Sequence, residues 1–268
     1  MSFRETRSLL VACLLLLSPC VVRAQVPDTV FLEELTWTEL RDQIRSGKTT
    51  ILVPIGGTEQ SGPHMALGKH NVRVRALSAA IARGLGNALV APVLAYVPEG
   101  RISPPEGHMR FPGTITIPDA TFAQLLESAA RSFKAHGFKD IVFLGDHSGY
   151  QATEKRVADR LNREWAATPV RAYALLEYYR LGEVEYAQLL KSRGFTEQEI
   201  GTHAGLSDTS RMLAVDPHLV RSESMQDPPS EASGVHGDPR RATAALGQVG
   251  VDLVVGRTIA AIKAATTR

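Results

Sequence analysis

The side chains best suited to chemistry in this 268-residue chain are its eight histidines, which are distributed unevenly. Two of them, His64 and His70, follow Glu59 in the segment GGTEQSGPHMALGKHN. Another, His147, stands beside Asp146 in FLGDHSGY. Because Zn²⁺, Mn²⁺ and Fe²⁺ accept imidazole and carboxylate ligands, this pattern indicates a metal site built from nitrogen and oxygen donors. A single histidine after a strand, however, is more often only hydrogen-bonded.

Two further histidines also lie in segments of polar residues. His203 opens HAGLSDTS, which places Asp208 five residues later, and His108 lies in the segment PPEGHMRFPGT. The chain contains no HExxH motif, nucleophile elbow GxSxG or P-loop, and no GxGxxG after a strand. The histidines without such neighbours are His136, His218 and His236.

Composition and charge limit the classes of protein. The chain is 44% hydrophobic and 22% charged, which is typical of a globular protein and excludes a disordered tail, a collagen or a coiled coil. Its net charge of +2 gives no strongly basic field, so we expect no nucleic-acid partner.

The N-terminus is typical of a cleaved signal peptide. Arg4 and Arg7 precede the apolar run Leu9–Leu17, which is too short to span a bilayer, and Ala24 ends a plausible cleavage site. We predict that residues 1–24 are a signal peptide, that residues 25–268 form one domain, and that the protein is periplasmic or secreted without stable membrane insertion. A short membrane anchor is the alternative.

Cleavage at this site would leave a chain without thiols. Both cysteines, Cys13 and Cys20, lie in the predicted signal peptide. Thiolate zinc sites and cysteine nucleophiles are then excluded, and any metal must be held by His, Asp and Glu.

Short apolar runs alternate with helical periodicity along the chain. Apolar spacing predicts helices over 74–85, 122–133 and 157–165, the second capped by Asp119 or Thr121, and a closing helix from Ala242 to Ala264. This alternation predicts an α/β fold, a single-domain three-layer sandwich with a mostly parallel central sheet. The predicted strands are Ile51–Ile55, Ala88–Ala91, Ile141–Leu144 and Val170–Leu175.

The elements place the polar clusters together. Glu59 comes four residues after one predicted strand and His147 three residues after another. Loops at the carboxyl ends of parallel strands line the ligand crevice, so we expect Glu59, His70 and His147 to converge there. Two stretches rich in Gly and Pro, Tyr96–Pro118 and Gln226–Pro239, read as long surface loops, which in a compact domain are often functional.

Five segments, in this order, resemble the motifs of the creatininase family: GGTEQSGPHMALGKHN, SPPEGHMRFPGTITI, FLGDHSGY, HAGLSDTSRMLAVDP and GVHGDPRRATAALGQVG. The similarity runs from about Val53 to Arg257. The resemblance implies an α/β fold, a homo-oligomer and an amidohydrolase that uses one or two divalent ions, often Zn²⁺ or Mn²⁺. In such enzymes metal-bound water attacks the carbonyl of a C–N bond.

The resemblance also implies residue roles. Glu59 and His147 match metal ligands of the family, and His203 matches a histidine that assists proton transfer. Asp208 stands where the family has a Glu. His64 matches a histidine that is usually not a direct ligand.

The chain also departs from the family pattern at other motif positions. Ser61 replaces a ligand histidine, His70 replaces the carboxylate that bridges two ions, and Asp146 replaces a glycine. A neutral imidazole supplies no negative charge between two cations, so we predict one ion rather than two. The predicted sets are Glu59, His70, His147 and Asp208 as metal ligands, His203 and Asp146 as catalytic residues, and His64, His108 and Ser148 as substrate-binding residues.

The predicted substrate is a small amide, a cyclic amide or a short peptide. The altered ligands and the export signal argue against creatinine itself. Two alternatives remain open, a small-ligand-binding protein without catalysis and a lactonase or other esterase acting through the same site.

Overall fold

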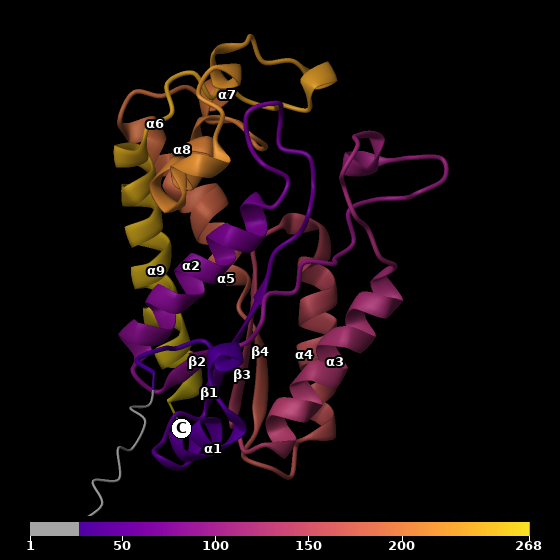
Figure 1. Ribbon diagram of the computed structural model, residues 1–268, viewed down its shortest axis with the longest axis vertical. Coiled ribbons are helices and arrows are strands. Elements are labelled where there is room, and N and C mark those ends of the chain that lie inside the picture. Colours follow the sequence, from indigo (N-terminus) through magenta and orange to yellow (C-terminus); the bar gives the residue numbers. More distant parts are fainter. Residues whose placement is uncertain (1–26, 268) are drawn as a thin grey trace, which may run out of the picture.

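The central sheet of the protein has four parallel strands in the order β2-β1-β3-β4 (Figure 1). They are β1 (Thr50–Ile55), β2 (Ala88–Val90), β3 (Asp140–Gly145) and β4 (Arg171–Ala174). The computed structural model describes residues 27–267, so the predicted signal peptide and its cleavage site lie outside the described residues. All four predicted strands are confirmed, with ends that differ by one residue at most.

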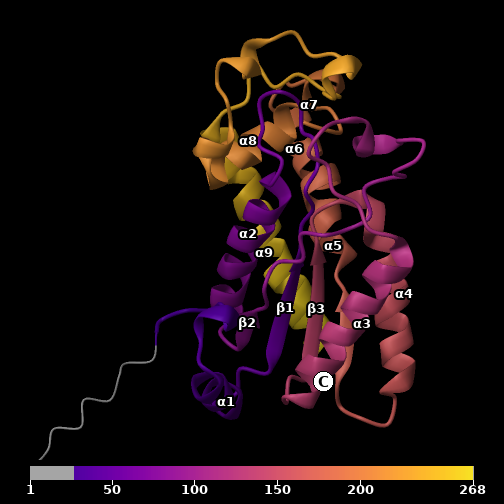
Figure 2. The same cartoon turned by 45° about the vertical axis from the view of Figure 1, so that its right-hand side comes forward.

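Helices cover both faces of the sheet and give three layers (Figures 1 and 2). On one face α3 (Asp119–Ala135) and α4 (Gln151–Glu164) pack against Ile51, Val53 and Ile55 of β1. On the other face α2 (Lys69–Leu85) and α9 (Ala244–Thr266) share a core with Leu52. Because successive side chains of a strand point to opposite faces and both faces are covered, β1 is apolar after Thr50 and every residue in it is buried. The α/β fold is as predicted.

The ends of the predicted helices follow from local signals. Gly86 takes the left-handed conformation that ends α2, with a φ of 81°, and the Thr243 side chain caps α9. The cap predicted for α3 is wrong: Pro118 holds the N-cap position without a side-chain hydrogen bond. Asp119 is instead the first helical residue and accepts a hydrogen bond from Thr153.

Several helices were not predicted from apolar spacing because they are short or exposed. They are α1 (Trp37–Arg45), α5 (Leu176–Arg180), a π-helical turn (Leu181–Glu185), α6 (Tyr186–Ser192), α7 (Glu197–Ile200) and α8 (Leu206–Val215). Short 3₁₀ turns cover Leu32–Glu34, Gly107–Arg110, Ser148–Tyr150, Pro217–Leu219, Ser224–Gln226 and Glu231–Ser233.

Among the described residues, α9 alone is long and apolar enough to cross a membrane by length and composition. Here it packs along α8 and α2. A Cβ on Gly247 would collide with the carbonyl oxygen of Ser210, so the backbones of α9 and α8 approach closely only because residue 247 is glycine.

The sheet order creates one point where chain connections diverge. From β1 the chain crosses through α2 to β2 on one side, whereas β3 pairs with β1 on the other side. In open parallel sheets, ligands bind outside the carboxyl ends of the strands at such a point. The loops that follow β1 and β3 begin here.

Candidate metal and active site

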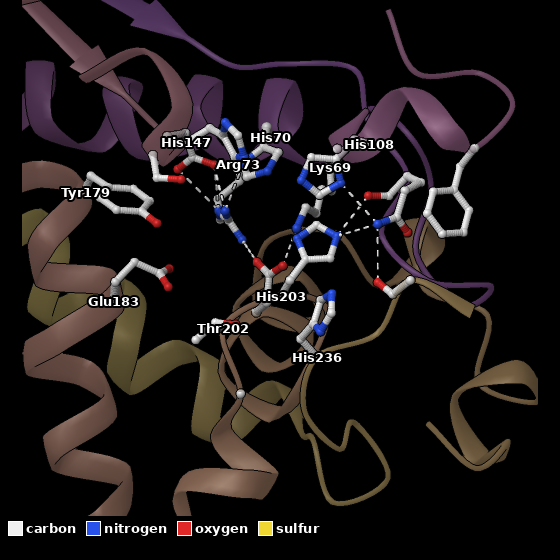
Figure 3. A pocket seen from close by; sticks show the side chains of 18 of the residues that line it. Lys69, His70, Arg73, His108, His147, Tyr179, Glu183, Thr202, His203 and His236 are labelled. Carbon is white, nitrogen blue, oxygen red and sulfur yellow. Dashed lines mark hydrogen bonds and ion pairs between the residues drawn. The ribbon is translucent and has the colours of Figure 1, made fainter. Parts of the chain in front are cut away.

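A cavity of about 520 Å³ opens at the carboxyl end of the sheet (Figure 3). The first turn of α2 contributes Lys69, His70 and Arg73 to its wall. The loop after β3 contributes His147, and the two long loops contribute His108 and His236. Segments that are distant in the sequence thus meet at one site.

Glu59 is the centre of this arrangement and is fully buried. Its Oε1 accepts a 2.8 Å hydrogen bond from Nε2 of His70. Its Oε2 lies 3.1 Å from Nε2 of His108 and 3.4 Å from Nε2 of His147, yet makes no hydrogen bond. The convergence expected of Glu59, His70 and His147 is therefore present.

A second buried carboxyl group, Glu99, faces the same point. Both of its oxygens are buried without a hydrogen-bond partner among the described residues. One of them lies 3.7 Å from Nδ1 of His147. Burial and the neighbouring charge of Glu59 raise the pKa of Glu99 to about 10. A buried polar atom without a partner is costly unless something absent from the chain satisfies it.

These residues fit a divalent cation. Glu59, Glu99, His108 and His147 each offer a ligand atom, and the four atoms lie within 4.8 Å of one another. Burial lowers the pKa of His147 to about 4 and also lowers the pKa of His108, so both rings are neutral near pH 7. Neutral imidazoles with carboxylates form a donor set suited to Zn²⁺ or Mn²⁺.

His70 has no free ring nitrogen in this structure. Its Nε2 bonds Glu59 and its Nδ1 lies 2.6 Å from Oδ2 of Asp146. Burial and Lys69 lower the pKa of His70, but the two carboxylates outweigh them and raise it. Asp146 is held in turn by Arg73 at 2.7 Å and by the Tyr178 hydroxyl at 3.0 Å. Asp146 thus orients His70 and has no free oxygen for a substrate.

Asp208, the other residue predicted as an additional ligand, is also fully engaged. Its two oxygens form ion pairs with Lys69 and Arg73. The backbone N–H of Ala204 donates a further hydrogen bond to it. Burial alone would raise the pKa of Asp208, but the surrounding cations hold it well below its usual range. The geometry therefore gives no support to His70 and Asp208 as metal ligands, because their donor atoms already have partners.

His203 faces the carboxylate of Glu59. Its Nε2 lies 3.0 Å from the carbonyl oxygen of Gln60, which accepts, and 3.1 Å from the side-chain nitrogen of Gln60, which donates, so the proton can sit on either ring nitrogen. Its Nδ1 lies 3.7 Å from Oε1 of Glu59. Burial lowers the pKa of His203 to about 3, so the ring is neutral near pH 7.

Of the other residues predicted to bind substrate, the structure places some in the cavity and others outside it. Ser148 lines the cavity. His64 does not: it is buried and its Nε2 bonds the Thr209 hydroxyl at 3.0 Å, which leaves it no contact with a substrate in the cavity. His236, which has no chemical neighbour in the sequence, pairs with His203 through a backbone bridge and lines the cavity.

Sequence reasoning also missed three charged residues of the site, namely Glu99, Lys69 and Arg73. Glu99 lies in the Tyr96–Pro118 stretch, predicted to be a surface loop, in which Val97 and Glu99 are instead buried. Its position in a long Gly- and Pro-rich loop was the available signal. Arg73 follows from placing His70 on a helix, because a residue three positions away shares its face, whereas Lys69 is adjacent to His70 and does not follow from this spacing.

Comparison with known proteins agrees with this fold. A sequence model of the family described as "Creatininase: Creatinine amidohydrolase" matches residues 33–262. Creatinine amidohydrolase of Pseudomonas putida is 28% identical over 204 residues, which cover 75% of this chain and 77% of that protein. The mycofactocin precursor peptide peptidase of Mycolicibacterium smegmatis is 28% identical over 237 residues, covering 79% and 83%.

Solved structures give the same result. A crystal structure of creatininase has a TM-score of 0.76 at 26% identity and covers 90% of this chain and 100% of that chain. A structure described as "Creatininase Mn" has a TM-score of 0.73 at 26% identity, with the same coverage.

Fold and site together define an α/β protein with a candidate metal centre at the carboxyl edge of a parallel sheet. The match over residues 33–262 makes the family plain: the chain belongs to the creatininase family.

Proposed function

We propose that this protein is a metal-dependent amidohydrolase that cleaves a C–N bond of a small molecule or short peptide. The ion is held by Glu59, Glu99, His108 and His147. The observation that carries the proposal is the Oε2 atom of Glu59, which lies beside two imidazole nitrogens without a hydrogen bond to either. A cation bound between them would be coordinated by this oxygen and by both imidazole nitrogens.

Related proteins support this chemistry. The relatives at 28% identity are a creatinine amidohydrolase and a peptide peptidase, both of which act on C–N bonds in small molecules or peptides. A creatininase structure at 26% identity is described as a manganese form. Mn²⁺ and Zn²⁺ are therefore the ions to test first.

When bound, the ion would polarise the amide carbonyl and make water more acidic. His203 supplies the proton relay. Its ring is neutral near pH 7 and its Nδ1 faces Glu59 at 3.7 Å, so the ring can take a proton from water and return it to the departing amine. Neutral amide and water thus become a carboxylic acid and an amine.

We propose one ion per chain rather than two. His70 and Lys69 already face Oε1 of Glu59, at 2.8 Å and 3.8 Å. These groups, with Arg73 behind them, place positive charge on that side of the carboxylate. A second cation there would be repelled, whereas the side of Oε2 carries two neutral imidazoles and Glu99.

The proposal is tested by metal analysis followed by a panel of substrates. Protein purified without chelator should carry a divalent ion and hydrolyse amides or short peptides, and chelation should abolish the hydrolysis. Hydrolysis of lactones but not of amides would make the protein an esterase. A protein that neither holds a divalent ion nor is activated by one would be a binding protein.

We also propose that the protein is exported and assembles as a homo-oligomer. N-terminal sequencing of the exported form should begin at or near Gln25, and an intact Met1 in the cytoplasm would contradict export. Light scattering of the purified protein measures the number of subunits.

A further inference from the structure

The candidate metal cluster stands in a wall between two cavities. The cavity described above, which we call cavity A, has a volume of about 520 Å³. A second one, cavity B, has a volume of about 500 Å³. Gly107, His108 and His147 line both of them. Two of the four proposed ligands therefore separate the two spaces.

The two cavities differ in chemistry. Cavity A is lined by buried charges, among them Lys69, Arg73 and Asp208. Cavity B has more apolar surface, from Pro98, Ile117 and Pro118, although Arg101, Asp119 and the buried carboxyl group of Glu99 also line it. A ligand that reaches into both cavities would meet polar surface on one side of the cluster and apolar surface on the other.

Each cavity is large enough for part of a substrate. Binding sites for small molecules usually have volumes of about 300–1,000 Å³, and both cavities lie within that range. A small cyclic amide would use only one of them, because its acyl and amine parts remain joined in one ring. An open-chain amide has two separate parts, and its C–N bond lies between them.

We infer that the substrate is an open-chain amide, peptide-like rather than cyclic, that occupies both cavities with its scissile bond at the wall formed by His108 and His147. The inference rests on the proposed function. The C–N bond breaks, the hydroxyl of water joins the carbonyl carbon, and the remaining proton goes to the nitrogen. The acid product then lies in one cavity and the amine product in the other.

The test uses simple secondary amides, R–CO–NH–R′, which contain a single amide bond. The groups R and R′ are lengthened separately from methyl, once to an apolar phenylethyl group and once to a polar carboxypropyl group. Binding to the metal-free protein is measured by calorimetry, and hydrolysis by the metal-loaded protein is measured as kcat/KM. We expect the phenylethyl group to improve both values on one side of the amide and the polar group to improve them on the other, and creatinine, a cyclic amide, to remain a poor substrate.

Two variants show which part of the amide occupies which cavity. Ile117→Trp fills cavity B and should lower binding and kcat/KM about tenfold for amides lengthened on one side only, since steric loss of apolar contacts has effects of this size. Thr202→Trp, at the wall of cavity A (Figure 3), should penalise lengthening on the other side. Leu125→Trp, on an exposed part of α3, is the control and should change neither series.

The outcomes separate the two proposals. One-sided effects on binding without any hydrolysis would overturn the proposed function and leave the two-cavity assignment standing. Hydrolysis in which Ile117→Trp affects both series equally, or neither, would overturn the two-cavity assignment alone. If Ile117→Trp does not fold, as judged by circular dichroism, the smaller change Ile117→Phe must show the same one-sided pattern.

Discussion

Oε2 of Glu59 lies 3.4 Å from Nε2 of His147, although one residue follows β1 and the other follows β3. The two strands pair in parallel, with Ile55 opposite Gly145. Both loops therefore start at the same height, next to the point where the connections from β1 and β3 diverge. The strand order brings the two side chains together although they are far apart in the sequence.

Glu99 is predicted to strengthen metal binding. Glu99→Gln keeps the size of the side chain but replaces a carboxyl group, which can give up its proton to a cation, with an amide that cannot, so the affinity for Zn²⁺ or Mn²⁺ should fall at least about tenfold. Glu106→Gln, in the same loop but exposed, is the matched control and should bind as the wild type does. Calorimetric titration of metal-free protein measures both, and equal affinity of Glu99→Gln and wild type would remove Glu99 from the ligand set.

His203 should affect turnover without affecting metal content. His203→Ala removes the imidazole ring, so kcat should fall about 10²-fold, the lower end of what general acid–base catalysis contributes. The bound metal measured by elemental analysis should stay at the wild-type level. His218→Ala, on an exposed turn, is the control. Loss of metal in His203→Ala would mean that this residue is a ligand.

The buried ion pairs of Asp208 should support the folded state. Asp208→Asn leaves Lys69 and Arg73 without part of their counter-charge. Breaking a buried pair in this way costs about 3–5 kcal/mol of unfolding free energy. Urea denaturation of metal-free protein measures the loss, and the exposed Asp42→Asn should show none. An Asp208→Asn protein as stable as the wild type would show that these pairs add nothing net.

Glu154 should make stability depend on pH. Its carboxyl group is fully buried without a hydrogen-bond partner, and burial raises its pKa well above the ordinary 4.5. Above pH 4.5 the unfolded chain loses a proton that the folded chain keeps. The unfolding free energy of the wild type therefore falls as pH rises, by up to about 1.4 kcal/mol per pH unit from this group.

Glu154→Gln removes this dependence. The variant should gain stability relative to the wild type between pH 5 and pH 7, while the difference stays constant below about pH 4, where both forms are neutral. Urea unfolding at several pH values measures it, with the exposed Glu177→Gln as control. A difference that does not change with pH would mean that Glu154 is ionised in the folded protein.

The strands and the long helices could be predicted because their apolar residues repeat with the period of the element. Glu59 and His147 could be placed because both follow apolar strands. The partners of His70 could not be predicted, since its contact with Asp146 depends on how α2 packs over the loop after β3. Glu99 was missed because nothing local shows that its side chain is buried. Only the three-dimensional structure reveals which carboxylates already have cationic partners and which do not.

The most direct test is elemental analysis of protein purified without chelator, in the wild type and in His147→Ala. We predict one divalent ion per chain in the wild type, and loss of both the ion and amide hydrolysis in His147→Ala. His218→Ala should keep both. Two ions per chain that are both needed for activity, or a His147→Ala protein that retains its metal, would contradict the single site of Glu59, Glu99, His108 and His147.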